Sequence, residues 1–208
     1  MKTPFILIPA LLFLLTISNL ALSQDSIRMT TNNGTESKEL RSIIDFEGIY
    51  MKTLNFGDAA LNEKYYEVTL QEYKNGQFVK STVLFDGAES DFFKINGNSL
   101  SLRFLVKLAD GQLKVALYGP NFTSAKKYFK LSSRTDDYVL KDFFGSPEQT
   151  IRLSPTESNP VLAIITPSVH KDGSASYCEV VQTGVKPEDF GKHFHIPHYF
   201  LISIRFKS

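Results

Sequence analysis

The sequence contains no tryptophan and only one cysteine, Cys178, among its 208 residues. A single thiol cannot form an intramolecular disulfide, so the fold must depend on its hydrophobic core for stability. Small secreted animal proteins usually carry disulfides, and their absence here favours a bacterial protein. The missing tryptophan removes a side chain on which sugar-binding modules often stack a sugar ring, although tyrosine or phenylalanine can replace it.

The sequence also lacks an excess of either charge, because 23 lysines and arginines face 22 aspartates and glutamates. The densest basic group, Lys126, Lys127 and Lys130, is typical of a solvated strand edge. A neutral chain without a basic block offers no electrostatic footprint to nucleic acid or to an anionic membrane, so we expect no nucleic-acid partner. Nucleophile-elbow, phosphate-loop, EF-hand and dinucleotide motifs are absent as well, and we expect no cofactor.

Residues 1–23 have the three-part pattern of a secretion signal. Lys2 supplies a positive charge and residues 5–15 are apolar without interruption. Ala21-Leu22-Ser23 then places small residues where signal peptidase cleaves, which predicts cleavage before Gln24 and a secreted or periplasmic protein. The alternative is an uncleaved anchor over residues 4–22, because about 20 residues span a bilayer. Polar residues in the second half favour cleavage, after which we expect no membrane span.

The rest of the chain divides into a leader and one domain. Residues 24–38 are polar and lack periodicity, which predicts a flexible leader. A short helix is predicted to begin at Ser37, where apolar residues start to recur at helical spacing, and to end before Gly48. Residues 39–208 have the length of a single domain. The 17 phenylalanines and nine tyrosines of the chain favour β-structure.

Two-residue turns are the strongest structural signals in the sequence. Asn75-Gly76 and Asp110-Gly111 accept the positive φ angles of type I′ turns, so each predicts a β-hairpin. The predicted strands that flank them are residues 65–74, 77–85, 99–109 and 112–118. A third turn, at residues 96–98, is predicted to connect residues 91–95 to the strand that begins at Ser99.

Alternating hydrophobicity predicts antiparallel sheet. Every second residue is apolar from Leu100 to Leu108 and again from Phe200 to Phe206. This period of two predicts one buried face and one solvated face, including for the last strand, residues 199–207. Residues 161–165 are apolar at every position, which predicts a strand covered on both faces and bounded by its flanking prolines. About ten strands are predicted in all, as in an all-β antiparallel sandwich or barrel.

Three of the four histidines lie close together near the C-terminus. In a strand, His193 and His195 would share a face, and such a pair can chelate zinc or copper. His198 could add a third ligand only if the chain bends at Pro197. Because no zinc signature accompanies these residues, we favour a surface loop with solvated or packed histidines and predict no metal site.

Two further sets of residues offer catalytic alternatives. Cys178 would be a nucleophile if His170 or a C-terminal histidine lay beside it, although a lone cysteine is more often a small buried apolar residue. Two convergent carboxylates would suit glycosidase chemistry. The candidates are Glu67, Glu72, Asp86, Glu89, Asp91, Asp136, Asp137 and Asp142. Sequence alone does not pair them.

One short segment resembles a known family. Phe46-Glu47-Gly48-Ile49-Tyr50 is similar to the Gly-x-Trp entry strand of lipocalin-like barrels, with Tyr50 in the place of the tryptophan. The resemblance implies a closed barrel that carries a ligand, as an alternative to a sandwich.

Taken together, these features predict an exported, non-catalytic binding protein of the bacterial envelope or the extracellular space. Its partner would be a glycan, an envelope protein or a small apolar ligand. The alternatives are a secreted hydrolase that uses paired acidic residues or a metal at the C-terminal histidines, a lipocalin-like carrier, and a purely structural envelope component.

Overall fold

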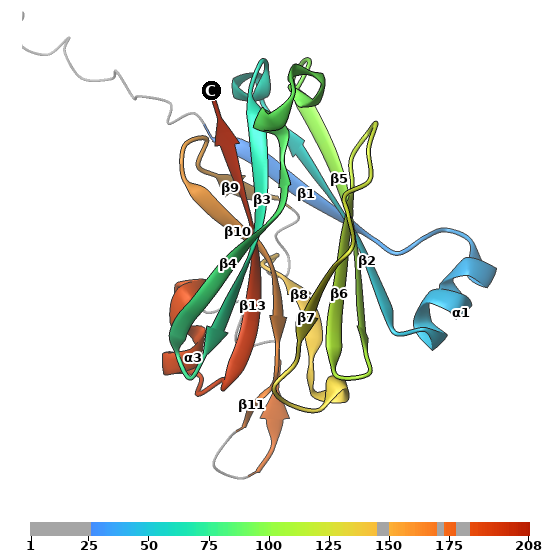
Figure 1. Ribbon diagram of the computed structural model, residues 1–208, viewed down its shortest axis with the longest axis vertical. Coiled ribbons are helices and arrows are strands. Elements are labelled where there is room, and N and C mark those ends of the chain that lie inside the picture. Colours follow the sequence, from blue (N-terminus) through green and yellow to red (C-terminus); the bar gives the residue numbers. More distant parts are fainter. Residues whose placement is uncertain (1–25, 145–149, 170–172, 178–183) are drawn as a thin grey trace, which may run out of the picture.

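A computed structural model describes residues 26–144, 150–169, 173–177 and 184–208. Two antiparallel sheets pack face to face (Figure 1). Sheet A has six strands in the order β7-β6-β5-β2-β1-β9, and sheet B has five in the order β4-β3-β13-β10-β8. The predicted all-β class is confirmed, and the architecture is a sandwich. The closed barrel implied by the lipocalin-like segment is wrong, because the two sheets stay separate and each keeps its own edge strands.

The elements have the following bounds. Sheet A contains β1 (Ile27–Asn33), β2 (Ile49–Gly57), β5 (Ser99–Ala109), β6 (Gln112–Tyr118), β7 (Lys127–Lys130) and β9 (Ile151–Leu153). Sheet B contains β3 (Tyr65–Lys74), β4 (Gln77–Asp86), β8 (Val139–Asp142), β10 (Ser158–Ile165) and β13 (His198–Lys207). A small hairpin joins β11 (Ser168–Val169) to β12 (Ala175–Ser176). The helices are α1 (Lys38–Phe46) and α3 (Phe190–His193), and the 3-10 turns are η1 (Ala59–Leu61), η2 (Gly87–Glu89), η3 (Asp91–Phe93), η4 (Thr135–Asp137) and η5 (Pro187–Asp189).

The predicted hairpins are confirmed. Asn75 and Gly76 have φ angles of 49° and 72°, and Asp110 and Gly111 have φ angles of 52° and 71°. Positive φ at both turn residues gives the type I′ geometry, whose twist matches that of the paired strands. The hairpins β3–β4 and β5–β6 therefore start their pairing directly at these turns.

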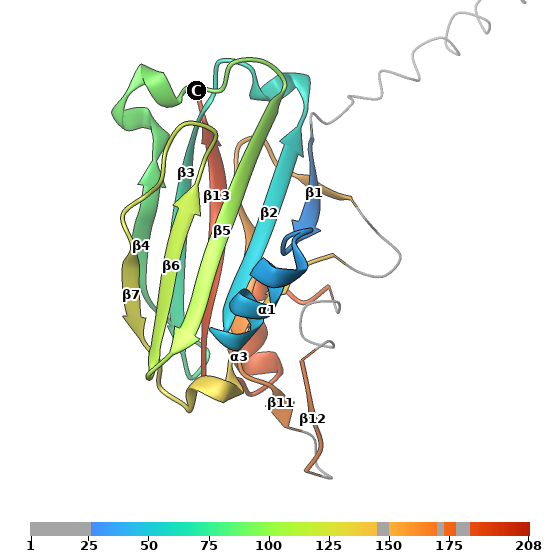
Figure 2. The ribbon, with the colours of Figure 1, turned by 90° about the vertical axis from the view of Figure 1, so that its right-hand side faces the viewer.

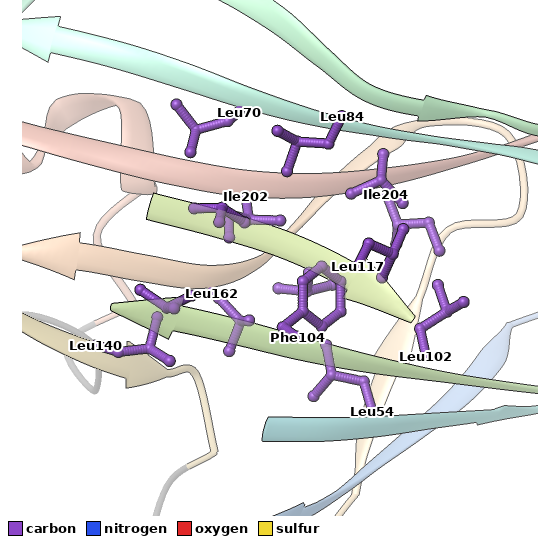
Figure 3. Packing of buried hydrophobic residues seen from close by; sticks show 14 of the residues in the cluster. Leu54, Leu70, Leu84, Leu102, Phe104, Leu117, Leu140, Leu162, Ile202 and Ile204 are labelled. Carbon is purple, nitrogen blue, oxygen red and sulfur yellow. The ribbon is translucent and has the colours of Figure 1, made fainter. Parts of the chain in front are cut away.

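The core lies between the two sheets and is built from the alternating apolar residues. Figure 3 shows side chains of both sheets meeting there, each at most 1% exposed: Leu54, Leu102 and Phe104 from sheet A, and Leu70, Ile202 and Ile204 from sheet B. Burial of one such side chain contributes about 1.5–3 kcal/mol. No helix in the described part of the chain is long and apolar enough to cross a membrane.

The flexible leader predicted for residues 24–38 is largely wrong. Ile27–Asn33 form β1, which pairs with β2 on one side and β9 on the other. Ile27 and Met29 are fully buried, so two apolar side chains anchor an otherwise polar strand. The helix predicted from Ser37 is confirmed: α1 follows it, and the Leu40 N–H donates to the Ser37 Oγ at 3.2 Å.

The last strand differs from the prediction that one of its faces is buried and the other solvated. β13 lies between β3 and β10 in sheet B, and its inward face is buried as expected. The opposite face is also buried at Tyr199, Leu201 and Ser203. Phe190 and Ile196, from the segment just before β13, pack on Tyr199 and Leu201 as a second hydrophobic core. The solvated face that period-two patterning predicted is therefore reached only at Arg205 and beyond.

The fully apolar segment at residues 161–165 is confirmed as a strand covered on both faces, because all five side chains are fully buried. Its predicted boundary is wrong at one end. β10 starts at Ser158, so Pro160 lies inside the strand. The pairing register with β13 shifts between Pro160 and Leu162, and such an irregularity tolerates a residue that has no N–H to donate.

Candidate functional site

His198 begins β13, and its side chain is fully buried. Its Nδ1 accepts the Ser132 backbone N–H at 3.3 Å and lies 2.6 Å from the Tyr138 hydroxyl. Because the Glu72 carboxylate beside Nε2 can only accept, we assign the proton of the neutral ring to Nε2 and the acceptor role to Nδ1. Nε2 donates to Glu72 Oε1 at 3.2 Å. Glu72, His198 and Tyr138 thus form a buried histidine network.

The electrostatics of this network favour a carboxylate beside a neutral imidazole. Burial lowers the pKa of His198 below its ordinary value, although Glu72 acts in the opposite direction. Burial by itself would raise the pKa of Glu72, but hydrogen bonds from Lys74 and His198 outweigh it and lower that pKa. The Lys74 and Lys80 ammonium groups lie 3.0 and 3.5 Å from the Glu72 carboxylate. With both ring nitrogens engaged, His198 has no lone pair left for a metal.

The other two candidate metal ligands lie elsewhere. His193 ends α3, and His195 occupies the following loop with a φ of 56°. The alternative in which they share a strand face is wrong, because β13 begins only at His198, and His195 lies in a loop as the favoured interpretation has it. Among the described residues, no group of three His, Cys, Asp or Glu side chains is placed to hold a metal ion. The candidate nucleophile Cys178 and its possible partner His170 lie outside the described residues.

Two of the candidate carboxylates are brought together. Glu67 on β3 lies opposite Asp86 on β4. The Lys207 Nζ contacts both, at 2.8 Å from Glu67 and 3.1 Å from Asp86. Burial would raise the pKa of Asp86, but hydrogen bonds from the Ala88 N–H and from Lys207 outweigh it and lower that pKa. A glycosidase acid needs a raised pKa, so this pair has the character of a surface ion pair.

The remaining carboxylates are dispersed. Glu72 belongs to the buried histidine network, and Asp142 forms an ion pair with Lys52. The Asp91 carboxylate accepts a hydrogen bond from the Tyr65 hydroxyl, and the Asp136 carboxylate lies 3.8 Å from the Arg134 guanidinium. Glu89 belongs to η2 and Asp137 to η4. Four pockets formed by described residues are each lined by at most one carboxylate. A hydrolytic pair is therefore not assembled at any of these four pockets.

An aromatic pocket is lined by residues of the loops at one end of the sandwich. These loops lie at the top of Figure 1. The volume of the pocket is about 180 Å³. Residues 92–100, which follow from η3 into β5, form one wall, and residues 120–122, after β6, form the other. Its aromatic lining comprises Tyr66, Phe92, Phe93 and Phe122, and its polar lining comprises Lys94, Asn96, Ser99 and Asn121.

Ring packing holds the walls of the aromatic pocket in place. Phe122 stacks on Phe85 with centroids 4.1 Å apart and planes 16° apart. Phe93 meets both rings edge-on, at 5.0 and 5.4 Å. Such contacts contribute about 0.5–1.5 kcal/mol each beyond area burial. Phe92 packs on Phe93 at 5.3 Å yet remains 64% exposed, so one aromatic face at the pocket is open to solvent.

Backbone contacts brace both walls. The Gly119 N–H donates to the Phe122 carbonyl at 3.0 Å, and a Cβ at position 119 would lie 1.9 Å from the Phe122 ring. On the other wall, the Ile95 N–H donates to the Lys64 carbonyl at 2.9 Å, and the Ile95 carbonyl accepts from the Glu63 N–H at 2.9 Å. The loops that carry Phe92 and Phe122 are therefore shaped before any ligand arrives.

The chemistry of this pocket suits an uncharged ring. Its aromatic side chains offer apolar faces, while Asn96, Asn121 and Ser99 offer amide and hydroxyl groups for hydrogen bonds. Burial raises the pKa of Tyr66, so its hydroxyl stays protonated. The Lys94 ammonium group forms an ion pair with Glu63, whose Oε2 lies 3.4 Å from the Lys94 Nζ.

Sequence reasoning missed this pocket. Its only local signal is the presence of phenylalanine in two polar loops, at Phe92-Phe93 and at Phe122, which follows Gly119-Pro120. The antiparallel β5–β6 hairpin places the start of β5 and the end of β6 at the same end of the molecule. The packing of Phe93 and Phe122 on Phe85 of sheet B then forms the pocket, and the sequence does not show this contact. The chain matches no protein-family model, and no curated protein or solved structure is similar enough to indicate a family or an activity.

Proposed function

We propose that the chain is an exported, non-catalytic binding protein that holds one ring of a glycan in the aromatic pocket. The observation that carries the proposal is a preformed pocket whose lining combines four aromatic side chains with two amides and a hydroxyl. Its other lining residues are Lys94, Ile95, Leu100 and Pro120. A sugar ring has the complementary surface, because one face presents C–H groups and the edge presents hydroxyls. Export is the expectation from residues 1–23, and it would place the pocket among extracellular or envelope glycans.

The size of the pocket supports a single ring. A buried cavity of about 150 Å³ accepts benzene, whereas pockets for drug-sized ligands measure roughly 300–1,000 Å³. The aromatic pocket, at about 180 Å³, lies near the lower figure. We therefore expect one terminal or side-branch sugar to enter it while the rest of the glycan stays outside.

Non-catalytic binding is favoured over hydrolysis by the state of the acidic residues. The pocket is not lined by any carboxylate, and Lys207 contacts both carboxylates of the Glu67–Asp86 pair. Retaining and inverting glycosidases both need two carboxyl groups on either side of the scissile bond.

An array of neutral oligosaccharides, followed by calorimetric titration of the best-bound saccharide, tests the proposal. Phe92→Ala should weaken binding about fivefold to tenfold, because loss of ring stacking removes about 1 kcal/mol. Asn96→Ala should also weaken it. Phe46→Ala is the matched control, because Phe46 is 88% exposed on α1 and does not line the pocket. Equal affinity in the Phe92→Ala variant and the wild type would exclude the pocket as the site.

A further inference from the structure

Sheet A contains no aspartate or glutamate in any of its six strands. The same strands contain these basic residues: Arg28, Lys52, Arg103, Lys107, Lys114, Lys127, Lys130 and Arg152. Sheet B, by contrast, mixes both signs, with Glu67, Glu72, Asp86 and Asp142 among its strands. A chain with almost equal numbers of acids and bases therefore segregates its charges between the two sheets.

The pairing register shows which of these cations share the outer face. Val106 pairs with Val115 and both are buried, so their neighbours Lys107 and Lys114, which also pair, point outward. The same alternation places Arg103 on the outer face of β5, Lys130 on that of β7, and Arg28 and Arg152 on those of β1 and β9. Lys52 and Lys127 alternate with them and belong to the inner face.

The outward cations follow a line across the sheet, which we call the basic diagonal. Lys130 lies level with Ala109 of β5, and Lys114 lies level with Lys107. Arg103 follows four residues further along β5. Arg28 and Arg152 lie level with Ser99, after another four residues, on the far side of β2. With a rise of about 3.3 Å per residue and strands about 4.8 Å apart, the diagonal is roughly 40 Å long.

Two pairs on the basic diagonal place like charges directly opposite each other. Lys107 faces Lys114, and Arg28 faces Arg152. Like charges at such positions destabilise a sheet, whereas opposite charges stabilise it. Two acidic residues lie beside the diagonal. The Glu47 Oε2 is 2.6 Å from the Lys107 Nζ, and Asp110 lies in the β5–β6 turn. The repulsion within these pairs would be relieved by an anion bound between them.

The groups around the diagonal decide which anion fits. Thr30, Thr53, Asn55 and Ser101 lie on the same outer face and present hydroxyl and amide groups. The cations are spaced by several residues, whereas a nucleic-acid strand carries a phosphate about every 3.4 Å. Only Tyr118 and Tyr128 add aromatic rings to this face, on β6 and β7, so the face lacks the ladder of rings on which unpaired bases stack. A linear polymer with spaced charges and many hydroxyls matches better.

We propose that the outer face of sheet A binds a linear anionic polysaccharide, whose carboxylate or sulfate groups follow the basic diagonal. In Figure 2, which faces sheet A, α1 stands in front of the start of β2. The first residue of β2, Ile49, pairs with Lys107, so α1 stands beside the Lys107 end of the diagonal. The rest of the diagonal runs from Arg103 to Arg28 and Arg152, away from the start of β2. The surface is distinct from the aromatic pocket, so the two binding activities are separable.

The test is titration of the purified protein with oligoalginate, a carboxylated polysaccharide, at several salt concentrations. We expect binding that weakens steeply between about 50 and 200 mM salt, because counterions are released when the polymer binds. Arg103→Glu/Lys130→Glu should weaken binding at least about tenfold and flatten the salt dependence. Arg205→Glu/Lys186→Glu is the matched control, because it changes the net charge equally at two exposed residues outside sheet A.

Three outcomes would overturn the proposal. They are absence of oligoalginate binding at low salt, equal loss of binding in both double variants, and tighter binding of single-stranded DNA than of oligoalginate, which would point to nucleic acid instead. Phe92→Ala should leave oligoalginate binding unchanged, and Arg103→Glu/Lys130→Glu should leave binding of a neutral saccharide unchanged. Failure at one surface is thereby distinguished from failure at the other.

Discussion

His198 illustrates, at the scale of single residues, how burial changes the chemistry that a residue type offers. Beside His193 and His195 in the sequence it looks like a third metal ligand, yet its ring is enclosed between Glu72, Tyr138 and the Ser132 N–H. Burial favours the neutral form of the ring, although the Glu72 carboxylate acts in the opposite direction. The residue therefore stabilises the start of β13 and is not available to a ligand.

We expect the protein to lose stability as the pH falls from about 7 to about 5. Histidine in the unfolded chain titrates near pH 6.5, whereas burial lowers the pKa of His198 in the folded protein. Below about pH 6.5 the unfolded chain binds a proton that the folded protein excludes, so acid favours unfolding. The stabilising contribution of neutral His198 is present above this pH and is lost as the pH falls through the lowered pKa.

Thermal melts of the wild type and of His198→Gln across this range check the expectation. The variant should show a weaker pH dependence, while His195→Gln, at an exposed position, should follow the wild type. A pH dependence identical in all three proteins would contradict the assignment to His198.

We also predict that His193, His195 and His198 bind no metal with high affinity, because His198 is committed to the buried histidine network. Elemental analysis of protein purified without a histidine tag measures this directly. Stoichiometric zinc or copper that disappears in His195→Ala would show the prediction to be wrong.

At the scale of elements, β13 is a central strand with a core on each face. Phe200, Ile202 and Ile204 face sheet A, and Tyr199 and Leu201 face the segment that contains η5 and α3. The stacked rings of Tyr73 and Tyr199, with centroids 4.8 Å apart, connect β3 to this second core.

We predict that Leu201→Ala and Ile202→Ala destabilise the protein by similar amounts, about 2–5 kcal/mol each. Both side chains are fully buried, although they point to opposite faces of sheet B. Arg205→Ala, at an exposed position of the same strand, should change the free energy of unfolding little. Chemical denaturation measures all three, and a harmless Leu201→Ala would mean that the second core is not packed.

β1 is the element for which amino-acid composition gives the most misleading prediction. Its polar residues resemble a leader, but its pairing with β2 and β9 places Met29 in the core. Met29→Ala should therefore cost about 2–5 kcal/mol in the free energy of unfolding. Asn32→Ala, at an exposed position of the same strand, should cost little. Comparable small losses at both positions would restore the description of this segment as a leader.

At the scale of the whole molecule, the predicted signal cleavage lies just ahead of the folded domain. Cleavage between Ser23 and Gln24 would leave only residues 24–26 before β1, which begins at Ile27. We expect the intact mass and the N-terminal sequence of the exported protein to start at Gln24. A mature protein that retains Met1 would contradict this.

Features that depend on neighbouring residues could be predicted from the sequence. The hairpins at Asn75-Gly76 and Asp110-Gly111, the helix start at Ser37 and the buried strand at residues 161–165 follow from local φ preferences, capping and hydrophobic periodicity. These effects act over a few residues, so a linear sequence contains them. The all-β class follows from their sum.

Features that depend on distant segments could not be predicted, because they follow from how the strands are ordered and packed in space. Composition shows a neutral chain, but strand order gathers the acid-free strands into one sheet and so creates the basic diagonal. The order of strands likewise places β13 at a sheet centre and encloses His198 between Glu72 and Tyr138. Burial, pKa and surface charge depend on what surrounds a side chain in space, and sequence neighbours do not report this.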